Sequence, residues 1–329
     1  MFEKGSDNSM SRLSKIYADF AEQEAAARSP LYAEICCGIA NNPAFLAKLV
    51  ELPAEKQQPN LFLAAVRYLC GTARDWPDFR ALADAHWDEA FAITMARRTQ
   101  TNEPARCATL LPLLALLPQP LALLEVGASA GLCLLPDKYA YDYGDHFIGP
   151  TNGDAGAPLF RCTANDATPL PKKNVEVIWR AGLDLNPLDV ANDDDVRWLQ
   201  ALVWPGEGER ARLLGEAIEV ARRDPPRVVK GDLRRDVKAL AAEAPKDATL
   251  VVFHTAVLAY VREAADRDAF AENVKQIGAQ WVSNESANLF QVADLPARPW
   301  GRFFLSLNGL PQAYTDAHGT AIDWFAPRP

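Results

Sequence analysis

The segment Leu121–Leu135, LALLEVGASAGLCLL, decides the fold of this chain. A short apolar run, Leu121–Leu124, precedes Glu125 and the glycine-bounded turn 127–131, and a second apolar run follows at helical spacing. This order predicts a strand, a tight turn and a helix. Such a turn leaves backbone N–H groups uncovered at a helix N-terminus, where glycine lets a ligand approach the backbone closely.

The sequence on the two sides of this segment differs in its periodicity. Before Leu121 the apolar residues recur at helical spacing, whereas after it short apolar runs alternate with helical segments. Alternating strands and helices predict an α/β fold with a mostly parallel sheet. We therefore expect an all-helical region over 1–118 and an α/β domain over 119–329. The domain should contain an irregular insertion at about 141–173 and end in an antiparallel hairpin.

Composition narrows the class of protein. The chain has 329 residues and a formal net charge of −9, so nucleic acid is not an expected partner. Its six cysteines include no C-x-x-C pair, which favours reduced thiols over disulfides or a metal site. The most apolar stretch, Leu110–Val126, is interrupted by three prolines and is too short for a membrane span. A soluble cytoplasmic protein is expected.

The turn itself supports three interpretations. As E-x-G-x-x-x-G, the run Glu125–Gly131 resembles the first motif of Rossmann-like S-adenosylmethionine-dependent methyltransferases. The resemblance implies that the cofactor's methionine and ribose contact Glu125, Gly127, Ala128, Ser129 and Gly131. As G-x-S-x-G, the run resembles the nucleophile elbow of α/β-hydrolases, with Ser129 as nucleophile. The third interpretation is a structural turn without a ligand. The helical character of the preceding residues favours the first, because it makes this the first strand of its sheet.

Acidic residues follow the next two predicted strands. Asp184 in GLDLNP is similar to the G-x-D-x-x-P pattern of methyltransferases, which implies a bond to the ribose hydroxyls. Asp232 in KGDL lies where the same family commonly places an acid facing the adenine amino group. The alternative for both is an acidic strand end or helix cap. Asp184 follows Glu125 by 59 positions, whereas a plain βαβ unit places the acid about 20 residues on.

His254 ends the predicted strand TLVVFH. The methyltransferase resemblance implies that the methyl acceptor lies beside the end of this strand. A histidine there could act as a general base, because its ordinary pKa lies near neutral pH. The alternative is a buried structural histidine.

Four further residues are candidates for binding a small polar acceptor. Asn102, Glu103 and Arg106 share a turn at the start of the helix leading into the glycine segment, and Trp204 follows the second strand. The structural alternatives are a helix cap for Asn102, an ion pair between Glu103 and Arg106, and core packing for Trp204.

A wider pattern combines Gln100–Glu103 and Arg106 with EVGASAGL, Arg180–Asp184 and Trp204-Pro205. This combination resembles one bacterial family, domain of unknown function 2332, over most of the chain. The resemblance implies a Rossmann-like, methyltransferase-type domain preceded by helices, and it implies no established reaction.

The leading hypothesis is therefore an S-adenosylmethionine-dependent methyltransferase that acts on a small molecule, mainly by positioning the acceptor. A serine hydrolase using Ser129 is the alternative enzyme. A non-catalytic nucleotide-binding or interaction module is the alternative outside enzymes. The sequence specifies neither the acceptor nor the oligomeric state.

Overall fold

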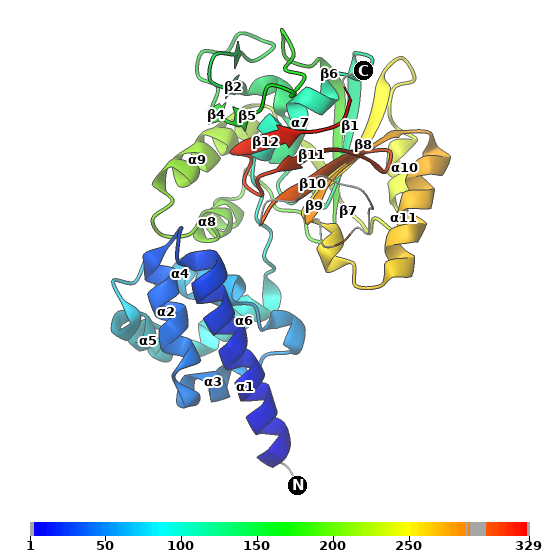
Figure 1. Ribbon diagram of the computed structural model, residues 1–329. Helices are drawn as coiled ribbons and strands as arrows, with labels where there is room; N and C mark the ends of the chain where they lie inside the picture. The colour runs from blue at the N-terminus through cyan, green and yellow to red at the C-terminus, as the bar shows by residue number, and fades with distance from the viewer. Residues whose placement is uncertain (1–2, 287–288, 290–300, 328–329) are drawn as a thin grey trace. The chain divides into compact units, whose positions relative to one another are not determined.

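The computed structural model describes residues 3–286, 289 and 301–327 (Figure 1). The chain forms two compact units. The first contains Met1–Thr101 and Asp193–Arg212, and the second contains Asn102–Asn192 and Leu213–Pro329. These bounds differ from the boundary at 118 expected from the sequence, because the helix before the glycine segment hydrogen-bonds to the sheet unit.

The first unit is helical, as expected for the N-terminal region. Its helices are α1 (Glu3–Phe20), α2 (Pro30–Ala40), α3 (Pro43–Leu49), α4 (Pro59–Cys70), α5 (Trp76–Ala85), α6 (Trp87–Ala96) and α8 (Asp193–Ala201), with the short turns η1 (Ala21–Ala25) and η2 (Ala54–Lys56). Three of them start on proline, which lacks the N–H that a first helical turn leaves unbonded. Among the described residues, no helix is long and apolar enough to cross a membrane.

Aromatic side chains fill the core of this unit. The Phe45 ring meets the rings of Phe62, Trp76 and Trp87 nearly edge-on, with centroids 5.6 to 5.9 Å apart. Edge-to-face pairs at this spacing add stabilisation beyond the burial of their area. The same core includes Trp204, which reaches it from the segment after α8.

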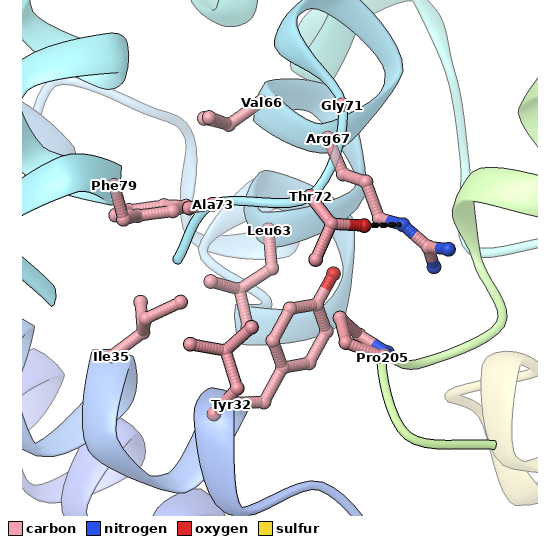
Figure 2. Close-up of a pocket in the computed structure, with 11 residues that line it drawn as sticks. Tyr32, Ile35, Leu63, Val66, Arg67, Gly71, Thr72, Ala73, Phe79 and Pro205 are labelled. Atoms are coloured by element: carbon pink, nitrogen blue, oxygen red, sulfur yellow. Dashed lines mark hydrogen bonds between the residues drawn. The ribbon is translucent and has the colours of Figure 1, made fainter. Parts of the chain in front are cut away.

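A small pocket lies beside this core, between α2, α4 and the segment after α4 (Figure 2). Its volume of about 10 Å³ is close to the room that one water molecule needs. The Tyr32 hydroxyl is buried beside it and has no hydrogen-bond partner among the described residues. Arg67 is near enough to act on it electrostatically, and burial raises the pKa of Tyr32. Arg67 Nε itself donates to Thr72 Oγ1 at 3.2 Å.

We predict that Tyr32→Phe leaves the free energy of unfolding unchanged or raises it by up to about 1 kcal/mol, because the buried Tyr32 hydroxyl makes no hydrogen bond of normal geometry with the described residues. Tyr143→Phe is the matched control, since the Tyr143 hydroxyl donates to Ala108 O at 2.6 Å. The control should lose about 1 kcal/mol. Urea unfolding measures both. A loss of more than about 1 kcal/mol in Tyr32→Phe would contradict this expectation and show that its hydroxyl is bonded, either to the neighbouring Arg67 or to an ordered water.

The second unit is built on a large sheet that is mostly parallel, as expected. Within the described residues, its strand order is β5-β12-β11-β10-β9-β8-β1-β6-β7. The strands are β1 (Leu121–Val126), β5 (Thr163–Ala164), β6 (Val177–Asp184), β7 (Arg227–Lys230), β8 (Thr249–Thr255), β9 (Gln280–Ser286), β10 (Phe303–Leu307), β11 (Leu310–Thr315) and β12 (Ala321–Trp324). The block from β7 to β9 is parallel, and the pairs from β9 to β12 are antiparallel.

The order of the parallel strands reverses beside β1. The chain runs from β1 outward to β6 and β7, then crosses back to β8 on the other side of β1 and continues to β9. The carboxyl ends of β1 and β8 are therefore adjacent, and the next strands in the chain lie toward opposite edges of the sheet. In open α/β sheets, this is where ligands bind.

Helices cover the two faces of the sheet. One face carries Leu124 and Val252, and it packs against α10 (Val237–Ala241) and α11 (Ala264–Ile277). The strand register places Glu125, Phe253 and Thr255 on the other face. There α7 (Arg106–Leu114) bonds to Thr255 through Arg106. The remaining helix, α9 (Gly208–Arg223), begins in the first unit and ends in the second.

The helix expected after the glycine turn is absent, which corrects that prediction. The 3₁₀ turns η3 (Leu132–Leu134) and η4 (Pro136–Lys138) follow instead. Residues 132–135 are all buried, so this run has no face for solvent as a surface helix would. Pro136 also disfavours helical backbone at the residue before it.

The insertion and the C-terminus hold more strand than expected. In the insertion, β2 (Ala140–Asp142), β3 (Phe147–Ile148) and β4 (Leu159–Arg161) form a small separate sheet, and β5 joins the main sheet beside β12. The expected terminal hairpin exists as β11 and β12, extended by β10 into an antiparallel meander. Its last turn docks tightly on the start of α7. A Cβ at Gly319 would lie 2.1 Å from Ala105 O.

This docking predicts a difference between two glycines. Gly319 and Gly309 have nearly equal φ angles of +81° and +79°, but a Cβ at Gly309 meets nothing within 4 Å. Gly309→Ala should cost about 1–2 kcal/mol, the strain of left-handed backbone. Gly319→Ala should cost about 1–3 kcal/mol more, because it also clashes with backbone. Equal losses in urea unfolding would contradict the docked position of the turn.

Candidate binding site at the carboxyl ends of the parallel strands

The glycine loop after β1 is tied into the protein by its own backbone. Its N–H groups donate to internal acceptors: Gly127 N to Leu183 O at 2.7 Å, Ser129 N to Asp184 Oδ2 at 2.8 Å, Gly131 N to Ala128 O at 2.7 Å and Leu132 N to Asn102 Oδ1 at 2.9 Å. The expectation of uncovered N–H groups at a helix N-terminus is therefore wrong for these residues. The loop contributes a fixed shape more than a row of free donors.

The glycines of the loop are required by packing. Gly127 and Gly131 have φ angles of +71° and +75°, which favour glycine. A Cβ at Gly127 would lie 2.4 Å from the Val257 side chain, and one at Gly131 would lie 2.8 Å from Pro226. The segment after β8 therefore packs against the loop at Gly127, and the segment before β7 packs against it at Gly131.

Asp184, at the end of β6, anchors this loop. Its two carboxylate oxygens accept hydrogen bonds at 2.8 Å from Ser129 N and Asn186 N. The residue predicted to bind a ribose therefore holds the backbone of another predicted cofactor residue. Its half-buried position keeps it at the edge of the site.

Asp232 follows β7 and is paired within the protein. Arg234 Nε donates to its Oδ1 at 2.9 Å, and the Arg234 hydrogen bonds lower the pKa of Asp232. Arg234 also donates to Asp266 at 2.9 Å. The predicted adenine-binding acid thus belongs to a chain of charges that links the ends of β7 and α11.

Glu125 is the buried acid of the site. Only 1 % of it is exposed, and its Oε2 has no hydrogen-bond partner among the described residues. Burial raises the pKa of Glu125 well above its ordinary value, while the nearby Arg106 guanidinium acts in the opposite direction. A buried acceptor without a partner is costly, so it marks the point where a ligand's donor would be stabilised.

Arg106 joins three segments beside Glu125. Its Nη1 donates to Thr255 O at 3.1 Å and to Thr255 Oγ1 at 3.2 Å, and its Nε donates to Ala317 O at 2.8 Å. The side chain is buried. It therefore connects α7 to the end of β8 and to the terminal turn.

The two neighbouring candidates also bridge segments. Asn102 accepts from Leu132 N of the glycine loop, as given above, and Glu103 Oε2 lies 3.4 Å from His318 Nδ1 of the terminal turn. Both are buried. The structure thus brings Asn102, Glu103 and Arg106 together with the loop and the end of β8.

Trp204 lies elsewhere, in the core of the helical unit. Its ring centroid is 5.2 Å from that of Phe20, and the Arg28 guanidinium lies 4.5 Å above it. Only 7 % of the residue is exposed. This placement matches the core-packing alternative.

His254 is completely buried, with both ring nitrogens occupied. Nδ1 lies 2.6 Å from Glu285 Oε1, and Nε2 lies 3.0 Å from the indole nitrogen of Trp281. These bonds give no support to the predicted role as a general base, which needs a nitrogen open to the substrate.

Two groups at the end of β9 were missed by the sequence analysis. Asn284 and Glu285 are both fully buried, and Asn284 Nδ2 and Glu285 Oε2 have no hydrogen-bond partner among the described residues. The signal was the polar run Ser283–Ser286, which interrupts a buried strand. Among the described residues, no group of His, Cys, Asp and Glu is arranged to hold a metal ion.

Two of the residues other than glycine with left-handed backbone lie at the same strand ends. Ser129 after β1 and Ala256 after β8 have φ angles of +52° and +58°. Left-handed backbone at residues other than glycine persists only where the surroundings impose it, and it is frequent at functional sites. The strained positions flank the point where the strand order reverses.

The fold and the site define the class of protein: an α/β protein with a mostly parallel sheet, a helical N-terminal region and buried polar groups at the carboxyl ends of adjacent strands. Residues 14–324 match the family described as "Uncharacterized protein conserved in bacteria (DUF2332)". The chain therefore belongs to this family, as its sequence pattern indicated. No curated protein matches it.

The burial of Glu125 predicts a pH-dependent stability. Because its pKa is raised in the folded protein above the ordinary value of about 4.5, the folded state holds this proton more tightly. Its contribution is complete below that value and is lost as pH rises toward the raised pKa. Glu125→Gln does not titrate. It should therefore gain stability relative to the wild type between pH 5 and 8, by up to about 1.4 kcal/mol per pH unit.

Urea unfolding at several pH values measures this gain. Glu51→Gln, at an exposed position of the helical unit, is the control and should differ from the wild type by the same amount throughout. A pH-independent difference for Glu125→Gln would mean that Glu125 is solvated or fully paired in solution.

Proposed function

We propose that this protein is an S-adenosylmethionine-dependent methyltransferase that acts on a small molecule, with its cofactor at the carboxyl ends of β1 and β8. The observation that carries the proposal is the buried Glu125 Oε2, which has no hydrogen-bond partner within the described part of the chain and lies where the strand order reverses. The order β7-β6-β1-β8-β9 corresponds to 3-2-1-4-5, that of doubly wound nucleotide-binding sheets.

The buried acids of the site support a ligand that donates hydrogen bonds. Glu103, Glu125 and Glu285 are buried near these strand ends, and Arg106 is the buried cation among them. S-adenosylmethionine carries a sulfonium and an ammonium group. An ammonium donor would satisfy Glu125 Oε2, which no described residue bonds, so the residues present fit this cofactor.

In this proposal the other predicted cofactor residues have different tasks. Gly127, Ala128, Ser129 and Gly131 form a wall of the site that backbone hydrogen bonds hold in place, and all but Ala128 have left-handed φ angles. Asp184 holds that wall and Asp232 belongs to an ion-pair chain. In this proposal both acids therefore act through the segments that they hold.

The chemistry in this proposal is positional. The cofactor, when bound, supplies an activated methyl group. The chain's own residues orient the two reactants and exclude water, and such positioning accounts for a large share of a transfer barrier. Arg106 fixes the end of β8 beside the loop, so that the wall facing an acceptor does not move.

The proposal predicts binding of S-adenosylmethionine and S-adenosylhomocysteine in calorimetric titration. Glu125→Gln should weaken S-adenosylmethionine about 10- to 100-fold, the effect of losing a hydrogen bond to a charged group. Glu51→Gln is the control and should bind like the wild type. No heat at millimolar cofactor would contradict the methyltransferase proposal.

The hydrolase alternative has a separate outcome. A nucleophile elbow turns from a strand into a helix, and here the 3₁₀ turn η3 follows the loop. Labelling of the wild type by a fluorophosphonate, lost in Ser129→Ala, would nevertheless establish Ser129 as a nucleophile and replace the proposal.

A further inference from the structure

Three side chains of β8 and β9 form a continuous hydrogen-bonded chain inside the sheet unit. Trp281 Nε1 lies 3.0 Å from His254 Nε2, and His254 Nδ1 lies 2.6 Å from Glu285 Oε1. The register pairs His254 with Ser283, so Trp281, His254 and Glu285 lie on one face of the sheet. The rings of Phe270 and Trp281 pack against the His254 ring, with centroids 5.7 and 6.0 Å away.

These hydrogen bonds determine which ring nitrogen of His254 carries the proton. An indole N–H can only donate, so His254 Nε2 accepts from Trp281. The ring proton of the neutral imidazole then lies on Nδ1 and is donated to Glu285. Both nitrogens are committed, and the side chain has no exposed surface.

Glu285 also accepts hydrogen bonds from the backbone after β8. The same oxygen that receives the His254 proton, Oε1, accepts from Val257 N at 2.7 Å and from Leu258 N at 3.1 Å. Ala256 N donates to Asn284 O at 3.0 Å. These bonds hold Ala256 at its φ of +58°, a conformation that its surroundings must impose.

The position of residues 256–258 affects the shape of the crevice beside β1. The Val257 side chain occupies the space that a Cβ at Gly127 would need, 2.4 Å away. The position of Val257 therefore sets the separation between the glycine loop and the end of β8. A shift of this segment would change the wall on which the proposed cofactor lies.

We propose that Trp281, His254 and Glu285 are positioning residues that set this wall through segment 256–258, and that His254 acts by holding Glu285. The inference rests on the proposed function for its ligand. It assigns a role to Glu285 and Trp281, and it replaces proton transfer by orientation as the task of His254.

Two substitutions of His254 separate the roles. His254→Gln can keep the chain, because its amide nitrogen donates to Glu285 and its amide oxygen accepts from Trp281. His254→Phe keeps a ring and loses both bonds. The measurements are amide hydrogen exchange at Val257 and Leu258 and calorimetric titration with S-adenosylmethionine, on the full chain.

For the wild type and His254→Gln we expect exchange rates and affinities within about threefold of each other. His254→Phe should exchange at least tenfold faster at both amides and bind the cofactor at least tenfold more weakly. If His254→Phe does not fold, His254→Gln decides. A tenfold loss of protection and affinity in that variant would overturn the inference.

The remaining outcomes distinguish this inference from the proposed function. If the wild type binds and both variants bind equally, the positioning role is overturned and the cofactor site stands; a general base that does not touch the cofactor gives this result. If the wild type does not bind, the proposed function fails. Hydrogen exchange then decides whether the hydrogen bonds of Trp281, His254 and Glu285 order segment 256–258. Equal exchange in His254→Phe and the wild type would overturn the inference.

Discussion

The buried guanidinium of Arg106 is the interaction on which the sheet unit depends. A charge removed from water is tolerated only when its donors are bonded and its field is balanced. Arg106 donates through Nη1 to the end of β8 and through Nε to the turn before β12, and the neighbouring acid Glu125 lies near enough to act on it. Three segments far apart in the chain are thereby held at one end of the sheet, where the parallel strands also end.

This arrangement explains why so many polar side chains at the site serve the fold and the site together. Asp184, which was expected to bind a ribose, accepts a hydrogen bond from the glycine loop, and Asn102 accepts from the residue after that loop. Each of these hydrogen bonds restricts the movement of a segment that forms the crevice wall. A wall whose shape is set before the ligand arrives loses less entropy on binding.

Part of this architecture could be predicted from local patterns. The apolar run and glycine turn around Glu125 indicated a strand followed by a tight turn, because both signals depend only on neighbours in sequence. The helical character of the first hundred residues followed from periodicity in the same way. The expected helix after Gly131 was wrong, because apolar spacing carries no information on whether a face for solvent remains.

The site depended on contacts that no local pattern contains. The sequence by itself determined the strand–loop unit, the helical N-terminal region, the membership of the family and the acids that end β1, β6 and β7. Only the tertiary structure decided which of these acids are already bonded, that Trp204 belongs to a core, and that Glu285 meets His254 across two strands. The physical reason is that hydrogen-bond satisfaction and burial depend on strand register and packing between distant segments, whereas periodicity and turn chemistry are properties of a few consecutive residues.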